Sequence, residues 1–152
     1  MRVHLKHALV GLAALGFVLG TQTAAQAQPA AKETTAVAID VLRSPYGGFN
    51  LYLDGIYAGQ VWWSQDPGGD LDGDGNSDPG DALIAYDNVT DGYGIEATLR
   101  TSDSHKVTTR GHGAPYWSPW GTGDLTETHT YYGDACVVKG TFSSCAAISV
   151  VA

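Results

Sequence analysis

Apolar and polar residues alternate with a period of two along this chain, and helical periodicity does not recur. Segments 37–41 and 93–99 carry the alternation most clearly, with an apolar residue at every second position. Because residues two apart in a strand face the same side of a sheet, this pattern predicts strands with one buried and one wet face. We therefore expect an all-β chain whose strands are joined by turns rich in Gly, Asn, Asp and Pro.

Turn residues divide the chain into short strands at intervals typical of a two-sheet fold. We expect a hairpin over residues 49–63, a further apolar contribution from Leu125, and strands at 37–41, 82–86, 93–99, 106–109, 130–138 and 143–151. Seven or eight short antiparallel strands favour a β-sandwich of the immunoglobulin or fibronectin type III kind. A β-barrel is the alternative, because strand order cannot be read from one sequence.

The hairpin predicts its own register, since Asp54-Gly55 is a favoured two-residue turn. Pairing around this turn separates an apolar face from a polar one: Phe49, Leu51, Leu53, Ile56 and Ala58 against Asn50, Tyr52, Tyr57 and Gly59. The same register places Gln60 on the apolar face. We therefore expect a β-bulge near Gly59, which would return Gln60 to the polar side.

The two cysteines, Cys136 and Cys145, predict one disulfide in an oxidising compartment. A two-residue turn at Gly140-Thr141 pairs residues whose numbers sum to 281, and the cysteine numbers have this sum. Glycine in the first turn position is typical of type II′. The pair falls on a non-hydrogen-bonded position, where side chains are closest. A reactive thiol is the alternative interpretation.

The first residues predict export of the chain. Basic residues at Arg2 and Lys6 precede an apolar run over 8–19 and small residues around Ala27, the pattern of a secretory signal peptide spanning 1–27. The apolar run is short for a membrane span. We expect a flexible leader over 28–35, a single domain over 36–152 and an extracellular location.

The formal charge of the chain bears on its partners. Residues 1–27 hold two of the eight basic residues and none of the sixteen acidic ones, so without them the charge changes from −8 to −10. Nucleic acid and anionic membranes are poor partners for such a chain. We expect a monomer that binds an extracellular glycan or a secreted protein.

Residues 70–81 read DLDGDGNSDPGD, with carboxylates at positions 1, 3, 5, 9 and 12 and glycine at position 6. Ca²⁺ takes six to eight hard oxygens, which a tight turn supplies from alternating positions. The expected ligands are side-chain oxygens throughout, except a backbone carbonyl at position 7: Asp70, Asp72, Asp74, Asn76, Asp78 and Asp81. Asp78 would bind directly or through water. The alternative is a solvated acidic loop without a metal.

This loop resembles those of EF-hands and, with Asp at position 12, those of the dockerin family. The resemblance covers these twelve residues and implies a structural Ca²⁺ site. Ser77 and Pro79-Gly80 depart from both patterns, and the chain has no second copy, so cohesin binding is not implied. The run from Gly80 to Ala97 and the C-V-V-K-G-x-x-x-x-C hairpin look like small secreted bacterial β-sandwich proteins of unassigned function.

Large aromatic residues give the candidate ligand-binding site. Residues 113–121 form a Pro/Gly segment with three rings, and the pair Trp62-Trp63 lies on a predicted strand, where only one ring can enter the core. Rigid exposed rings lose little entropy on binding and could stack on sugars or anchor a protein. The candidate ligand-binding residues are Trp62, Tyr116, Trp117 and Trp120. The alternative is that the 113–121 rings close one end of the core.

The sequence predicts binding rather than catalysis. His112 and His129, with Glu96 or Glu127, could do acid–base work, but no metal-ligand spacing, nucleophile elbow or paired carboxylate accompanies them. We therefore expect a non-catalytic calcium-binding sandwich that binds a polysaccharide or cell-wall glycan. A secreted inhibitor or interaction protein, docking through segment 113–121, is the alternative.

Overall fold

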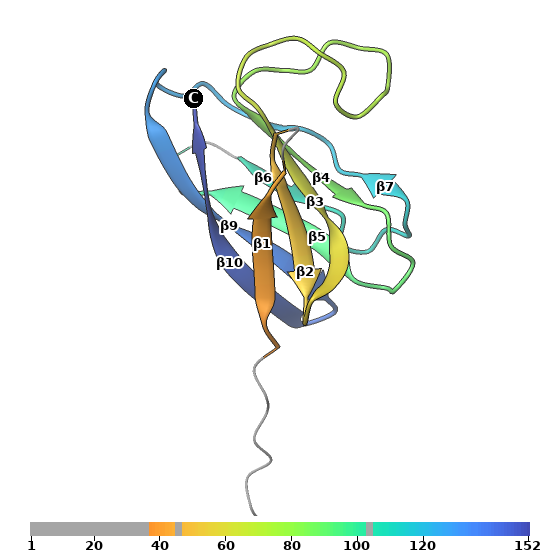
Figure 1. The fold of residues 1–152 in the computed structure, drawn as a ribbon. Helices are drawn as coiled ribbons and strands as arrows, with labels where there is room; N and C mark the ends of the chain where they lie inside the picture. Colours follow the sequence, from red (N-terminus) through yellow and green to blue (C-terminus); the bar gives the residue numbers. More distant parts are fainter. Residues whose placement is uncertain (1–36, 45–46, 103–104) are drawn as a thin grey trace, which may run out of the picture. The chain divides into compact units, whose positions relative to one another are not determined.

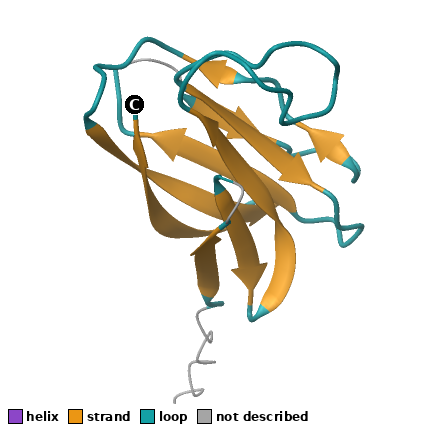
Figure 2. Ribbon diagram, turned by 45° about the horizontal axis from the view of Figure 1, so that its top comes forward, coloured by secondary structure: helices purple, strands orange, loops and turns teal. Residues whose placement is uncertain are grey.

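The structure, a computed structural model, describes residues 37–44, 47–102 and 105–152. These residues form ten strands in two antiparallel sheets, and no helix occurs among them (Figure 1). Strands and connecting loops alone make up the described chain (Figure 2). The predicted signal peptide (1–27) and leader (28–35) lie outside the described residues.

The larger sheet has six strands in the order β1-β2-β3-β4-β7, and β8 also pairs with β4. β3 occupies one edge of β4, so β7 and β8 share the other edge. The strands of this sheet are β1 (Ile39–Arg43), β2 (Phe49–Leu53), β3 (Ile56–Ser64), β4 (Ala82–Asp87), β7 (Tyr116–Trp117) and β8 (Gly121–Thr122).

The smaller sheet has four strands in the order β10-β9-β5-β6. Its strands are β5 (Gly94–Leu99), β6 (Lys106–Thr108), β9 (Thr130–Lys139) and β10 (Phe142–Val151). The chain crosses between sheets after β4, after β6 and after β8. The two sheets are therefore each assembled from segments far apart in the sequence.

The predicted all-β sandwich is confirmed, and the two sheets do not close into the alternative barrel within the described residues. All eight expected strands are present, and the two additional ones, β7 and β8, have two residues each. The first four strands are adjacent in chain order, unlike the A-B-E-D order of immunoglobulin constant domains. Leu125 is buried as expected but lies in a loop.

The expected β-bulge is present in the β2–β3 hairpin. Leu51 pairs with Gly59 and Tyr52 pairs with Tyr57, which leaves Ala58 as the extra residue. Gly59 has a φ of +155°, and a Cβ there would lie 2.6 Å from the Ile95 side chain. Only glycine fits this position without a shift of its neighbours.

The bulge changes which side chains share a face. Gln60 pairs with Asn50 on the polar side, as the bulge predicts. Gly59 pairs with Leu51, so its expected place on the polar face is wrong. Ile56 was expected on the apolar face, but it is 71% exposed because it adjoins the turn of the hairpin.

The core lies between the two sheets and is built from alternate residues of the central strands. Val61, Leu83 and Ile95 are completely buried there. The other members are Phe49, Leu51, Ala58, Ala85, Ala97, Leu99, Val107, Leu125, Ala135, Val137, Ile148, Val150 and Ala152. Trp63 packs against this cluster and donates from Nε1 to the Val151 carbonyl at 2.9 Å. It is thus the core member of the Trp62-Trp63 pair.

The expected disulfide joins Cys136 and Cys145 on β9 and β10, with the Cα atoms 4.0 Å apart. The register pairs the two cysteines directly and pairs Lys139 with Phe142. Gly140 has a φ of +55° in the connecting turn, as a type II′ turn requires of its first central residue. The disulfide prediction and its register are confirmed.

Replacing Cys136 and Cys145 together with alanine should lower the free energy of unfolding by up to about 2.7 kcal/mol, the chain-entropy value for so short a loop. The native pairing should persist, because nine other residue pairs hold the same hairpin in register. Urea unfolding of the wild type and the variant would measure the loss. A variant that fails to fold would show that strand pairing alone does not hold the hairpin and that the disulfide is required for it.

Candidate metal centre and aromatic sheet face

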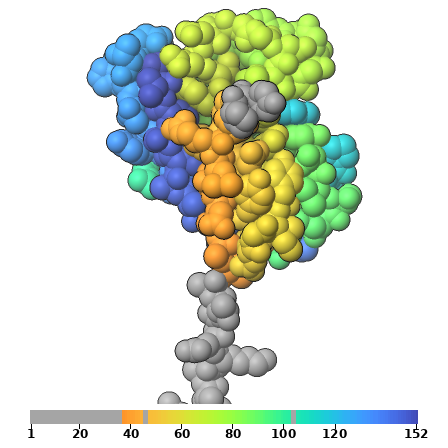
Figure 3. Space-filling model, viewed as in Figure 1, coloured from red at the N-terminus to blue at the C-terminus, as the bar shows by residue number. Residues whose placement is uncertain are grey.

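The connection between β3 and β4, residues 65–81, forms a loop that closes on itself at its base. We call it the metal loop, because it contains the candidate metal ligands. Asp81 N donates to the Gln65 carbonyl at 3.0 Å, and Gly68 N donates to the Asp78 carbonyl at 3.0 Å. Asp78 N in turn donates to the Gly69 carbonyl at 3.4 Å. The loop projects beyond the end of the sheets as the yellow-green lobe in Figure 3. Its base is therefore held by backbone bonds, whereas its tip is exposed.

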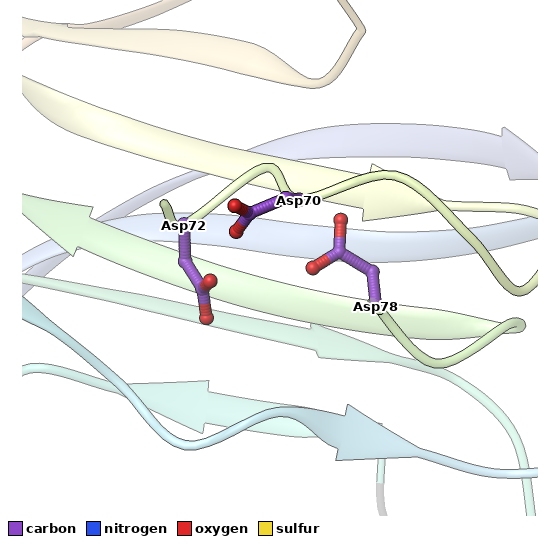
Figure 4. A group of neighbouring side chains, drawn as sticks. All are labelled: Asp70, Asp72 and Asp78. Atoms are coloured by element: carbon purple, nitrogen blue, oxygen red, sulfur yellow. The ribbon is translucent and has the colours of Figure 1, made fainter. Parts of the chain in front are cut away.

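Three carboxylates converge within this loop. One oxygen from each of Asp70, Asp72 and Asp78 lies within 4.8 Å of the others (Figure 4). Asp78 is 3% exposed, Asp72 is half-buried and Asp70 is exposed. No lysine or arginine in the described chain lies within 4.0 Å of these carboxylates. The cluster could hold a metal ion.

Backbone amides of the loop fix the orientation of each carboxylate. Leu71 N donates to Asp78 Oδ2 at 2.7 Å, and Gly75 N donates to Asp70 Oδ2 at 3.2 Å. Gly75 has a φ of +84°, consistent with the sharp turn predicted there. These bonds hold the carboxylates together despite their mutual repulsion.

The other three predicted ligands lie outside this cluster. Asp74 directs both oxygens at Asn76, which donates from its backbone N at 2.7 Å and from Nδ2 at 3.0 Å. These bonds, the side-chain one foremost, lower the pKa of Asp74. Asp81 accepts a bond from Leu125 N at 2.9 Å, and its other oxygen is buried without a partner in the described chain. Their roles as ligands stay predictions.

A buried histidine that sequence reasoning missed supports the base of the loop. His105 is completely buried, and its Nε2 donates to the Asp81 carbonyl at 2.8 Å. Its Nδ1 lies 3.1 Å from Thr101 Oγ1. A Cβ at Gly123 would lie 2.2 Å from the His105 ring. A lone histidine before a short strand gave no sequence signal for this role.

A line of directly opposed residues crosses five strands on the outer side of the larger sheet. Directly opposed residues in neighbouring strands project to the same side. The line runs from β1 to β7 through Leu42, Asn50, Gln60, Tyr86 and Trp117. Leu51, Val61 and Ala85 face the core. Successive residues of a strand face opposite sides, so Asn50, Gln60 and Tyr86 face away from the core.

Aromatic rings lie in this line and beside it, on the same side of the sheet. Tyr86 stacks on Trp117 with centroids 4.1 Å apart, and Tyr52 meets Tyr57 edge-on at 5.7 Å. Trp62 lies two residues beyond Gln60 on β3. We call this surface the aromatic face, and its members are Asn50, Tyr52, Tyr57, Gln60, Trp62, Tyr86 and Trp117, all half-buried.

Two hydrogen bonds order the polar groups of the aromatic face. Gln60 Nε2 donates to Asn50 Oδ1 at 2.9 Å, and Trp62 Nε1 donates to Gln60 Oε1 at 3.1 Å. Asn50 Nδ2 has no acceptor among the described residues, so its two donors remain available there. The face thus combines fixed rings with an oriented amide.

The structure divides the four predicted ligand-binding residues. Trp62 and Trp117 belong to the aromatic face, whereas Tyr116 points to the other side of β7 and stacks on His112 at 3.8 Å. Trp120 donates from Nε1 to Asp72 Oδ2 at 3.2 Å and so contacts the metal loop. None of the 113–121 rings is among the described residues packed on the core, so the core-lid alternative is not supported.

Sequence reasoning missed three members of the aromatic face as ligand candidates: Tyr52, Tyr57 and Tyr86. A signal for two of them existed, because Tyr52 and Tyr57 fall on the polar side of the predicted hairpin. Tyr86 joins them only through the pairing of β3 with β4 and of β4 with β7, which no local pattern predicts.

The candidate acid–base residues make other contacts. His129 Nδ1 lies 3.1 Å from the backbone carbonyl of Glu127. Glu96 lies 3.8 Å from both Lys106 and Arg110. These contacts are of the kind that hold loops and strands on a surface.

A buried carboxyl lies at the end of β4, on the residue paired with Tyr116 of β7. Asp87 is 1% exposed and accepts a hydrogen bond from Val89 N at 3.1 Å. Burial raises the pKa of Asp87, the bond from Val89 offsets part of this rise, and the Asp91 charge adds to it. The pKa of Tyr57 is also raised. Burial is the main cause, and the side-chain hydrogen bond with Asn88 offsets part of the rise.

Replacing Asp87 with asparagine should raise the melting temperature at pH 7. A carboxyl with a raised folded-state pKa destabilises the fold once the pH exceeds that pKa, and this penalty disappears below the ordinary value of 3.8. Asparagine keeps an oxygen for Val89 N and carries no charge. Thermal unfolding of both proteins from pH 3 to pH 8 should show a gain that shrinks as the pH falls. A gain independent of pH would contradict this explanation.

Comparisons with known proteins leave the family open. No protein-family model, curated protein or solved structure matches the chain. No helix of the described residues is long and apolar enough to cross a membrane. The disulfide is compatible with an extracellular protein. Any function must therefore be argued from the loop, the aromatic face and the surrounding surface.

Proposed function

We propose that this protein is a secreted, non-catalytic binding module whose ligand is a polysaccharide or cell-wall glycan. The observation that supports the proposal is the aromatic face, on which five rings and two amides share one side of a sheet. Sugar rings present apolar C–H faces and polar edges, and such a surface offers complementary groups for both. The signal peptide and the disulfide agree with an extracellular site of action.

The dimensions of the aromatic face suit an extended ligand. Neighbouring strands lie about 4.8 Å apart, so the aromatic face, from β2 to β7, spans roughly 14 Å. The rings are held by stacking and by sheet pairing, so little side-chain entropy is lost when a ligand settles on them. A chain of several sugar units matches this length better than a single sugar does.

We also propose that the acidic cluster binds Ca²⁺ as a structural ion. Hard carboxylate oxygens suit Ca²⁺, and its larger coordination number leaves room for the Asn76 carbonyl, Asp81 or water. Asp78 supports this assignment, because a carboxylate that is 3% exposed has no cationic side chain near it in the described chain. The ion would offset this buried charge.

Calcium should raise the melting temperature of the wild type, and Asp70→Asn combined with Asp72→Asn should abolish most of this rise. Asparagine keeps the hydrogen-bond acceptors but removes two charges from the cluster. At a calcium concentration one hundred times Kd, binding stabilises the fold by about 2.7 kcal/mol. Thermal unfolding in calcium and in chelator would measure the effect.

Asp74→Asn is the matched control for the calcium experiment, since Asp74 carries the same charge in the same loop but lies outside the cluster. The control should retain most of the rise in melting temperature. If Asp74→Asn loses as much of the calcium-dependent rise as the double variant, Asp74 is a ligand, as the sequence spacing predicts. An unchanged rise in the double variant would remove the calcium site from this cluster.

Wild-type protein should be retained on at least one insoluble glycan from a panel of cellulose, chitin, xylan and peptidoglycan. Trp62→Ala and Trp117→Ala should each weaken retention at least tenfold, equivalent to about 1.4 kcal/mol. Tyr132→Ala is the control, because Tyr132 is 63% exposed on the other sheet. Pull-down isotherms, with the melting temperature of each variant as a folding check, would decide.

Two outcomes of the pull-down would overturn the proposal. Equal losses for Tyr132→Ala and Trp62→Ala would place glycan binding away from the aromatic face. No retention of folded wild type on any glycan would favour the alternative of a protein partner. Segment 113–121 would then be the first surface to test.

A further inference from the structure

A basic pocket opens where the start of β5, the connection from β6 to β7 and the β9–β10 turn meet. It has a volume of about 350 Å³, and Tyr93, Arg110, His112 and Lys139 line it together with five glycines. The chain carries eight basic residues against sixteen acidic ones, so two cations lining one pocket stand out. Nothing in the metal loop or the aromatic face accounts for them.

Lys139 contributes a charge without a carboxylate partner in the described chain. Its Nζ donates to the Asp91 carbonyl at 2.9 Å and lies 4.5 Å from the centroid of the Tyr93 ring. The Asp91 carboxylate accepts instead from Tyr93 N at 2.9 Å. An ammonium has three donors, so Lys139 is held in place with donors to spare.

Arg110 contributes a second charge that is only partly balanced. Its Nη1 donates to the Gly140 carbonyl, and its Nε lies 3.8 Å from Glu96. Glu96 also lies 3.8 Å from Lys106, so one carboxylate faces two cations. A guanidinium has five donors in a fixed fork that matches a carboxylate. An anion in the pocket would balance the remaining charge.

The glycines keep the pocket open to a ligand. A Cβ at Gly92 would lie 3.1 Å from Lys139 Nζ, and one at Gly94 would lie 3.2 Å from Arg110 N. Side chains at these positions would crowd the two cationic residues. The backbone at the pocket can therefore come close to a small charged group.

The pocket meets the edge strand β7 of the larger sheet through His112. His112 lines the pocket and stacks on Tyr116 at 3.8 Å with an interplanar angle of 2°. Tyr116 is followed directly by Trp117, a member of the aromatic face, on the two-residue edge strand β7. A chain of sugars lying across Trp117 would have to bend around this edge to reach the cations.

We infer that this pocket binds the carboxylate of a uronic acid unit, so that the ligand is an acidic polysaccharide. The inference rests on the proposed glycan binding and names its substrate class. Lys139 and Arg110 supply the charge, and the Tyr93 ring supplies an apolar wall for the sugar. Because the contact is ionic, added salt weakens it.

The test compares binding of tetragalacturonate and of its fully methyl-esterified form, which share one backbone and differ in charge. Calorimetry on the full chain in calcium should show that wild type binds the acid at least tenfold more tightly than the ester. Lys139→Met keeps an unbranched apolar side chain beside Tyr93 and should remove most of this preference. Arg100→Gln is the matched control, since Arg100 pairs with Asp134 at 2.9 Å outside the pocket.

The outcomes separate this inference from the proposed function. Equal affinity for acid and ester in wild type would overturn the pocket inference while glycan binding stands. Binding of neither probe by a protein that is retained on the insoluble glycan panel would also overturn the pocket inference. An equal loss of preference in Arg100→Gln would do the same. Loss of affinity for both probes in Trp62→Ala, with loss of preference only in Lys139→Met, would support both proposals. Binding of neither probe and retention on no glycan would overturn both.

Discussion

β4 is buried on both of its faces, and its position orders the elements around it. Leu83 and Ala85 face the core, while Ala82 and Ile84 are buried on the outer side. A strand enclosed in this way must also satisfy its backbone on both edges, which β3 does on one side and β7 and β8 do on the other. Its register therefore sets the metal loop before it and the Tyr86–Trp117 stack within the sheet.

Local pairing could be predicted from the sequence, and distant pairing could not. The β9–β10 hairpin and the bulge near Gly59 follow from a turn and a period-two pattern within about a dozen residues. The β4–β7 pairing joins Tyr86 to Trp117, thirty-one positions later, through a strand of two residues. Such a strand is too short for any periodicity, so the aromatic face was only partly predictable.

The candidate metal centre shows a similar division between spacing and side-chain direction. The spacing of residues 70–81 brings Asp70, Asp72 and Asp78 together, as the sequence predicts for three of its six candidates. Asp74 turns to Asn76 and Asp81 turns to Leu125, because amides close in space satisfy their oxygens. Side-chain direction thus depends on neighbours such as Leu125 that a twelve-residue pattern does not contain.

The link between loop and sheet suggests how the proposed metal site and the proposed glycan surface would be coupled in one small domain. Asp78 lies in the cluster, Asp81 is tied to His105 and Leu125, and β4 begins at the next residue. Trp120 bridges from the edge of the same sheet to Asp72. An ion at the cluster would neutralise repulsion that otherwise opposes this closed arrangement. Its effect on a ligand would then pass through the order of β4 and β7, without contact between ion and sugar.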